Sequence, residues 1–158
     1  MQAHIFSLQR SGGGVPKLAI REAEVGPQGM AGDRQRDRRN HGGPERALCL
    51  YSLEAILALQ QEGHPIFPGS TGENVTISGL DWPTLNPGDV LHLGNEVVVQ
   101  ITSYTVPCNN IEPSFRGGEF KRISQKVHPG WSRLYARVLQ AGTLQVGQAV
   151  SVVAADRL

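Results

Sequence analysis

The stretch VLHLGNEVVVQITSYTVPC, residues 90–108, decides the fold. Two short apolar runs, 90–93 and 97–102, flank Gly94-Asn95, a turn signal typical of β-hairpins. The second run is expected to extend over 96–104 and to end before Pro107, because proline fixes its own φ and has no N–H to donate. The stretch therefore predicts a hairpin that delivers Cys108 into a turn.

Two interpretations of Cys108 follow from its neighbours. In a turn, its thiol can meet solvent or a ligand, and Asn109-Asn110 would supply amide donors to a thiolate or a polar ligand. The alternative is a small buried hydrophobe, the commoner fate of a lone cysteine.

Composition narrows the class of protein. A chain of 158 residues predicts one domain, 1–158, and its 15 Lys+Arg against 14 Asp+Glu disfavour nucleic-acid or membrane binding through net charge. No export signal or apolar run of membrane-spanning length occurs, so we expect a soluble, cytoplasmic protein in which the two cysteines form no structural disulfide. The 19 glycines and 10 prolines between short β-branched runs indicate many turns joining short strands, as in a barrel or sandwich.

An arginine-rich segment, GDRQRDRRNHGGPER, spans residues 32–46. From Asp33 to Arg46 five arginines oppose three acids, a local net charge of +5 − 3 = +2. Arginine suits bidentate recognition of phosphate or carboxylate, and Gly42-Gly43 would let backbone N–H groups approach an anion. The alternatives are an anion site or a solvated loop whose charges neutralise one another, and His41 fits either.

The other expected elements flank these two stretches. The clearest is a helix over 52–62, with Ser52 as its cap and apolar residues at helical spacing. Cys49 falls in a short apolar strand and is expected in the core. The remaining strands are expected over 4–9, 18–25, 46–51, 73–78 (one wet face), 131–139 (one polar face) and 149–153, with an irregular helix or lid over 113–127.

The order of these pieces resembles the MOSC domain, named for the C-terminal domain of molybdenum-cofactor sulfurases, over about residues 18–153. Each short motif is weak evidence by itself, but the whole set in this order is hard to obtain by chance. The matching pieces are Gly32-Asp33, His41-Gly42-Gly43 with Arg46-Ala47, Tyr51-Ser52, Gly72-Glu73-Asn74 with Gly79-Leu80, Pro87-Gly88-Asp89, Pro107-Cys108, and Tyr135-Ala136-Arg137-Val138 before Gly142 and Gly147.

The resemblance implies a mostly β, barrel-like fold with a few peripheral helices and a bound molybdenum cofactor (molybdopterin). It implies that Cys108 either ligates molybdenum or carries sulfur as a persulfide, with the pterin held by neighbouring loops. The cofactor-binding residues implied by the matching motifs are Asp33, His41, Gly42, Gly43, Glu73 and Asn74. Because they are positively charged, Arg34, Arg36 and Arg38 are further candidate partners for the pterin phosphate. Asn109 is a candidate because it directly follows Cys108.

This sequence departs from the family pattern in two respects. Asn109-Asn110 stands where other residues, often a basic one, are expected after the cysteine. The chain also has no room for the pyridoxal-phosphate domain of full-length sulfurases, so no pyridoxal phosphate is expected in this chain alone.

Three functions remain open from the sequence. The first is a molybdenum-cofactor protein that transfers sulfur or reduces small N-oxygenated compounds, with a cysteine desulfurase or an electron-transfer protein as partner. The second is a module that binds the cofactor or another anion without turnover. The third, a nucleic-acid-binding small barrel, is disfavoured by the near-neutral charge and the nine aromatic residues, which show no stacking arrangement.

Overall fold

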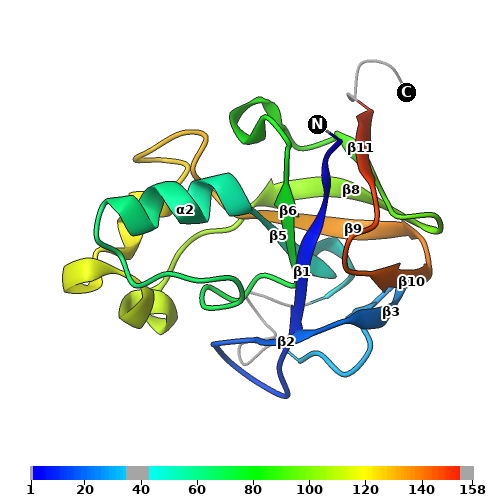
Figure 1. Cartoon of the computed structure of the whole chain (residues 1–158), viewed down its shortest axis with the longest axis horizontal. Coiled ribbons are helices and arrows are strands. Elements are labelled where there is room, and N and C mark those ends of the chain that lie inside the picture. Colours follow the sequence, from blue (N-terminus) through cyan, green and yellow to red (C-terminus); the bar gives the residue numbers. More distant parts are fainter. Residues whose placement is uncertain (1, 35–42, 154–158) are drawn as a thin grey trace.

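The structure is a computed structural model that describes residues 2–34 and 43–153 (Figure 1). Eight strands form one sheet in the order β11-β7-β8-β9-β5-β6-β1-β2. Their bounds are β1 His4–Arg10, β2 Leu18–Ile20, β5 Leu48–Ser52, β6 Val75–Ser78, β7 Val90–Leu93, β8 Val97–Tyr104, β9 Leu134–Gln140 and β11 Val150–Val153. A smaller sheet of order β10-β3-β4 contains β3 Glu22–Gly26, β4 Gly29–Met30 and β10 Gly142–Gln145.

The predicted hairpin of residues 90–104 is confirmed. β7 and β8 pair antiparallel from Leu93↔Val97 to Val90↔Gln100, and Gly94 turns the chain with φ 68°, a left-handed conformation that favours glycine. β8 then pairs with β9, and β9 pairs with β5. The hairpin is thus built into the large sheet between β11 and β9.

The strand expected over residues 18–25 is wrong as a single element. The chain pairs with β1 over β2, bends at Arg21, and continues as β3 in the smaller sheet. The carbonyl of Arg21 accepts the backbone N–H of Val146, which joins the bend to the end of β10. A single run of alternating apolar residues therefore contributes strands to two different sheets.

Helix α2, Leu53–Gln61, follows β5 directly and confirms the predicted helix. The Ser52 side chain accepts the N–H of Ala55 at 3.1 Å, as expected of an N-cap. Ile56 and Leu59 are fully buried and pack into the core, and burial of each such side chain stabilises the fold by about 1.5–3 kcal/mol.

The mostly β fold is confirmed, whereas a closed barrel is not. In the described residues the ladder of the large sheet is open between β11 and β2. An isolated bridge between His4 and Ala149 nevertheless brings β1 against the chain leading into β11, and the N–H of Val150 donates to the carbonyl of Ala3. The sheet therefore curls back on itself without a continuous ring of strand pairs.

The large sheet carries a buried polar layer on one face. Leu48 and Ala136 form one cross-strand pair and Cys49 and Tyr135 the next, so the two pairs point to opposite faces. The face of Cys49 holds the buried polar layer, defined here as Gln9, Cys49, Tyr51, Thr76 and Tyr135, all 5% exposed or less. The wet face expected for residues 73–78 is therefore wrong, because Thr76 is fully buried and its hydroxyl accepts the side-chain amide of Gln9 at 3.2 Å.

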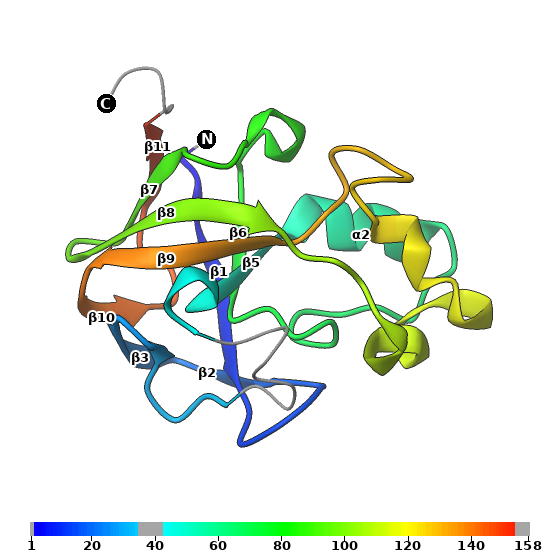
Figure 2. The same ribbon diagram turned by 180° about the vertical axis from the view of Figure 1, so that it is seen from behind.

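Three short 3₁₀ helices follow Cys108 and overlap the irregular helix or lid expected over 113–127. They are η3 Asn109–Ser114, η4 Arg116–Gly118 and η5 Phe120–Ile123. They lie beside α2, away from the smaller sheet, as both overall views show (Figures 1 and 2). Within the described residues, no helix has the length and apolar character needed to span a lipid bilayer.

Candidate functional site

Cys108 lies at the predicted turn beyond β8. The N–H of Thr105 still donates to the carbonyl of Arg133 at 2.9 Å, after which Val106 is 74% exposed. Cys108 is extended, with φ −139° and ψ 175°, and its carbonyl accepts the N–H of Ile111 as η3 begins. Its side chain is half-buried, so the thiol sits at the border between the core and solvent.

Tyr135 and Arg46 lie next to this turn. The Arg46 guanidinium carbon is 5.6 Å from the centre of the Tyr135 ring, a cation–π distance. Burial raises the pKa of Tyr135, and negative charge on Cys49 or Cys108, when either is ionised, raises it further, while Arg133 and Arg46 oppose the rise. Both thiols are thus within electrostatic range of one phenol, and Arg46 is a cation near the site that sequence analysis did not select.

Cys49 is a core residue, as predicted. It is 2% exposed, and burial raises the pKa of its thiol. Its sulfur is 3.8 Å from the Thr105 hydroxyl, and its strand partner is Tyr135. Both of the chain's cysteines fall within the described residues, and neither forms a disulfide. Because Cys49 is buried, Cys108 is the only accessible thiol.

An ion pair fixes the beginning of the arginine-rich segment. The Lys17 ammonium is 2.7 Å from Asp33 Oδ2, and the two side chains are 1% and 6% exposed. Asp33 also accepts the Asn74 amide at 2.9 Å and the N–H of Ser11 at 2.9 Å, while Asn74 Oδ1 accepts the N–H of Cys49 at 3.0 Å. The structure therefore brings the predicted residues Asp33 and Asn74 together. It also pairs Asp33 with Lys17, a buried lysine that sequence analysis missed.

Glu73 and Arg133 are buried charged residues without an ion-pair partner in the described part of the chain. Glu73 is fully buried; its Oε1 accepts the Thr71 hydroxyl at 3.1 Å and its Oε2 has no partner. Burial raises the pKa of Glu73, and the positive charge of Arg133 opposes the rise. Arg133 is 5% exposed and donates Nη1 to the Thr71 carbonyl at 2.5 Å, while its Nε has no partner.

The other predicted site residues divide into two groups. Asn109 is exposed directly after Cys108, and Arg34 and Gly43 are exposed at the two ends of the arginine-rich segment. The predicted residues Arg36, Arg38, His41 and Gly42 lie outside the described residues.

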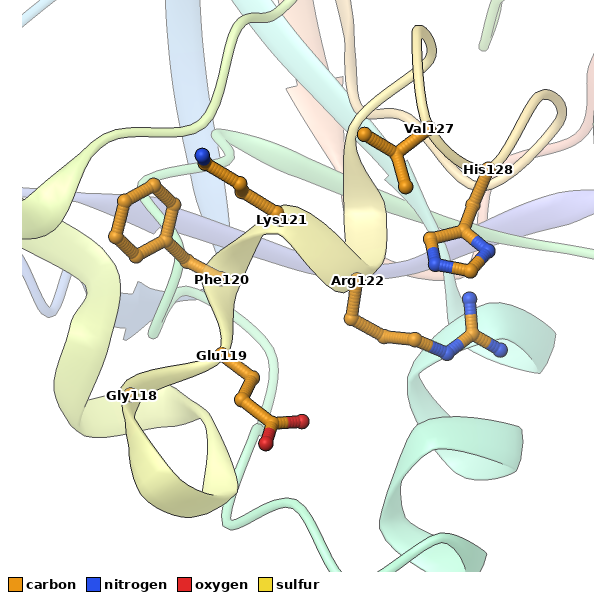
Figure 3. Close-up of a pocket in the computed structure, with 7 residues that line it drawn as sticks. All are labelled: Gly118, Glu119, Phe120, Lys121, Arg122, Val127 and His128. Atoms are coloured by element: carbon orange, nitrogen blue, oxygen red, sulfur yellow. The ribbon is translucent and has the colours of Figure 1, made fainter.

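A shallow pocket of about 410 Å³ lies along η5 and is separate from Cys108. Its lining residues are Gly118, Glu119, Phe120, Lys121, Arg122, Val127 and His128. Figure 3 shows Phe120 and Lys121 directed away from Arg122 and His128. Arg122 is already engaged, because its Nε and Nη2 donate to Glu62 at 2.9 and 2.8 Å. Lys121 is therefore not directed to the same point as Arg122 and His128.

The fold and site define a β-sheet domain with one half-exposed thiol at a strand end. In the part of the chain that the structure describes, no group of three or more His, Cys, Asp or Glu residues is placed to hold a metal ion. The protein thus offers a single sulfur ligand and no metal cage among these residues.

Comparison with known proteins places this domain in a family. The model of the MOSC domain matches residues 37–151. YflK, an uncharacterized protein of Bacillus subtilis, is 32% identical over 121 residues, which cover 76% of this chain and 53% of YflK. The chain belongs to the MOSC domain family.

Two further similarities agree with this assignment. A reductase of Gibberella moniliformis is 25% identical over 152 residues, which cover 90% of this chain and 26% of the reductase. The crystal structure of YiiM from Geobacillus stearothermophilus matches with a TM-score of 0.72 at 25% identity, covering 96% of this chain and 75% of that chain. The chain spans about half the length of YflK and about a quarter of the reductase.

Proposed function

We propose that this domain binds the molybdenum cofactor through Cys108, as molybdenum ligand or as carrier of persulfide sulfur. The observation that carries the proposal is the contrast between two thiols: Cys49 is 2% exposed inside a strand, whereas Cys108 is half-buried at a strand end. A soft thiolate suits a sulfur-rich molybdenum centre. Membership of the MOSC domain family supports the same cofactor.

The residues present fit a metal that arrives inside an organic cofactor. Such a metal needs one protein ligand, and the described residues offer one accessible thiol and no cluster of metal ligands. Arg46 would compensate negative charge on the bound group, and the exposed amide of Asn109 would donate hydrogen bonds to it. When bound, the cofactor would supply two-electron redox chemistry or an acceptor for sulfur.

Two reactions suit such a site. In the first, a small N-oxygenated substrate takes up two electrons and two protons, its N–O bond breaks and water leaves, with the electrons supplied by an electron-transfer protein. The similarity to a protein named reductase favours this version. In the second, the Cys108 thiolate would take the outer sulfur from a persulfide of a cysteine desulfurase, which releases the desulfurase thiol. Cys108 would then pass that sulfur on to the reduced cofactor, which would supply the two electrons, and the Cys108 thiolate would be regenerated.

The test is molybdenum content together with pterin fluorescence of protein purified from a molybdate-sufficient host. We expect both in the wild type, loss of molybdenum in Cys108→Ala, and retention in Cys49→Ala, which removes the buried thiol instead. Thiocyanate released by cyanide from the wild type, and not from Cys108→Ala, would identify the sulfur carrier. Absence of metal, pterin and thiocyanate from all three proteins would refute the proposal.

A further inference from the structure

A second pocket, of about 260 Å³, lies between the first turn of α2 and the segment before β9. We call it the tryptophan pocket. Its lining residues are Ser52, Glu54, Ala55, Leu80, Asp81, Trp82, Pro83, Gly130 and Trp131. It contains both tryptophans of the chain and none of the residues assigned to the cofactor.

Hydrogen bonds and packing hold the Trp82 ring and the Trp131 backbone in place. Trp82 is 5% exposed, donates its Nε1 to the Ser132 carbonyl at 2.8 Å, and packs edge-to-face on Tyr51 with ring centres 6.1 Å apart. The Tyr51 hydroxyl donates to the Trp131 carbonyl at 2.7 Å. Because these contacts fix the Trp82 ring and the Trp131 backbone in advance, ordering them would cost a ligand little.

The charged residues of the pocket are all acidic. Glu54 and Asp81 line it, and no lysine, arginine or histidine does. The Glu54 carboxylate accepts the Ser78 hydroxyl at 2.8 Å and the N–H of Gly79, whereas the Asp81 carboxylate has no hydrogen bond or ion pair with any described residue. One carboxylate is thus structurally engaged, and the other is available to a ligand.

The N-terminus of α2 does not convert this pocket into an anion site. Its orphan N–H groups attract negative charge, but Ser52 already accepts the N–H of Ala55 and Glu54 supplies an anion in the first turn. The remaining electrostatic preference is set by Asp81 and by the two tryptophans that line the pocket.

Trp131 already acts as a platform for a cation in this structure. The Arg122 guanidinium carbon lies 4.1 Å from the centre of the Trp131 ring. Glu62 accepts two hydrogen bonds from Arg122 and neutralises its charge. The repulsion that Arg122 exerts on a second cation is therefore small.

We propose that the tryptophan pocket binds a small organic cation, an ammonium group attached to a flat aryl or short alkyl body. The indole rings would take the apolar body, and the ammonium would lie between Asp81 and Glu54, where cation–π and Coulomb attraction act together. A volume of about 260 Å³ is below the size of most drug pockets and fits a ligand of one ring. This proposal is independent of the proposed cofactor.

Benzylammonium is the probe, and the two tryptophans are the reporters. Because both line the pocket, a ¹H–¹⁵N spectrum contains only two indole signals and both should shift on titration. We expect saturation with a Kd of about 1 mM, weaker binding at high salt, and no comparable shift with benzyl alcohol, which has the same shape without the charge.

Asp81→Asn tests the charge without removing the side chain. We expect about three- to fivefold weaker binding of benzylammonium, and no change in Glu24→Gln, whose carboxylate is exposed on β3 in the other sheet. Equal shifts with benzylammonium and benzyl alcohol would overturn the cation selectivity, and no saturable shift up to about 10 mM would overturn the site. The indole shifts with benzylammonium and with benzyl alcohol do not depend on molybdenum content. This proposal and the proposed function can therefore fail separately.

Discussion

The ion pair between Lys17 and Asp33 should contribute strongly to the stability of the fold. Its N–O distance is 2.7 Å and both side chains are nearly fully buried. Lys17→Met would leave the Asp33 carboxylate uncompensated inside the protein, a change that costs about 3–5 kcal/mol. Since Asn74 and Ser11 still donate to that carboxylate, we expect the lower part of this range.

In a chain of this length, about 3 kcal/mol lowers Tm by about 6–12 °C. Urea unfolding followed by far-ultraviolet circular dichroism measures the free energy directly, and Lys121→Met, at an exposed position, is the control. The double change Lys17→Met/Asp33→Asn should recover most of the loss, because replacing both charges removes the uncompensated one. A single variant within about 1 kcal/mol of the wild type, or a double variant less stable than the single one, would refute this reasoning.

Three further outcomes follow from the structure. Burial raises the pKa of Glu73 above its usual 4.5, so the folded protein keeps a proton that the unfolded chain loses. Stability should therefore fall as pH rises from about 4.5 towards the raised pKa, and Glu73→Gln should flatten that slope in urea titrations while Glu24→Gln retains it. A maleimide should label the native protein once, at Cys108, and Cys49 should react only after unfolding; two labels on the native protein would contradict the assigned burial. Ser52→Ala should cost about 1 kcal/mol through loss of the α2 cap, and an unchanged unfolding midpoint in urea would show that the cap contributes nothing.

The sequence predicted the elements whose signals are local. The hairpin of residues 90–104 has apolar runs on both sides of a turn dipeptide, and the helix after Ser52 has its cap and its apolar stripe within eleven residues. The place of Cys108 followed from one proline. Each of these signals acts between neighbours in the chain, which is the range over which alternation and capping apply.

The sequence could not predict contacts that tertiary structure alone creates. Alternation indicates which side chains share a face, but it does not say whether a loop covers that face; Thr76 and Tyr135 were expected on polar faces and are buried. Lys17 has no local feature that distinguishes it from an exposed lysine, because its partner Asp33 is 16 residues away. The switch of sheets at Arg21 likewise depends on pairing with β10, more than 120 residues further on.

The buried polar layer is hard to explain as a source of stability. Buried polar groups seldom stabilise a fold more than apolar ones of similar volume, so a sheet face carrying a thiol, two phenols and a nearby unpaired arginine is costly unless it does something else. Here each group holds the next: Asn74 bonds the backbone of Cys49, Cys49 pairs with Tyr135, and Tyr135 adjoins the Cys108 turn. The Lys17–Asp33 ion pair lies at the far end of this series of contacts, which joins residues from distant parts of the chain beneath the Cys108 turn.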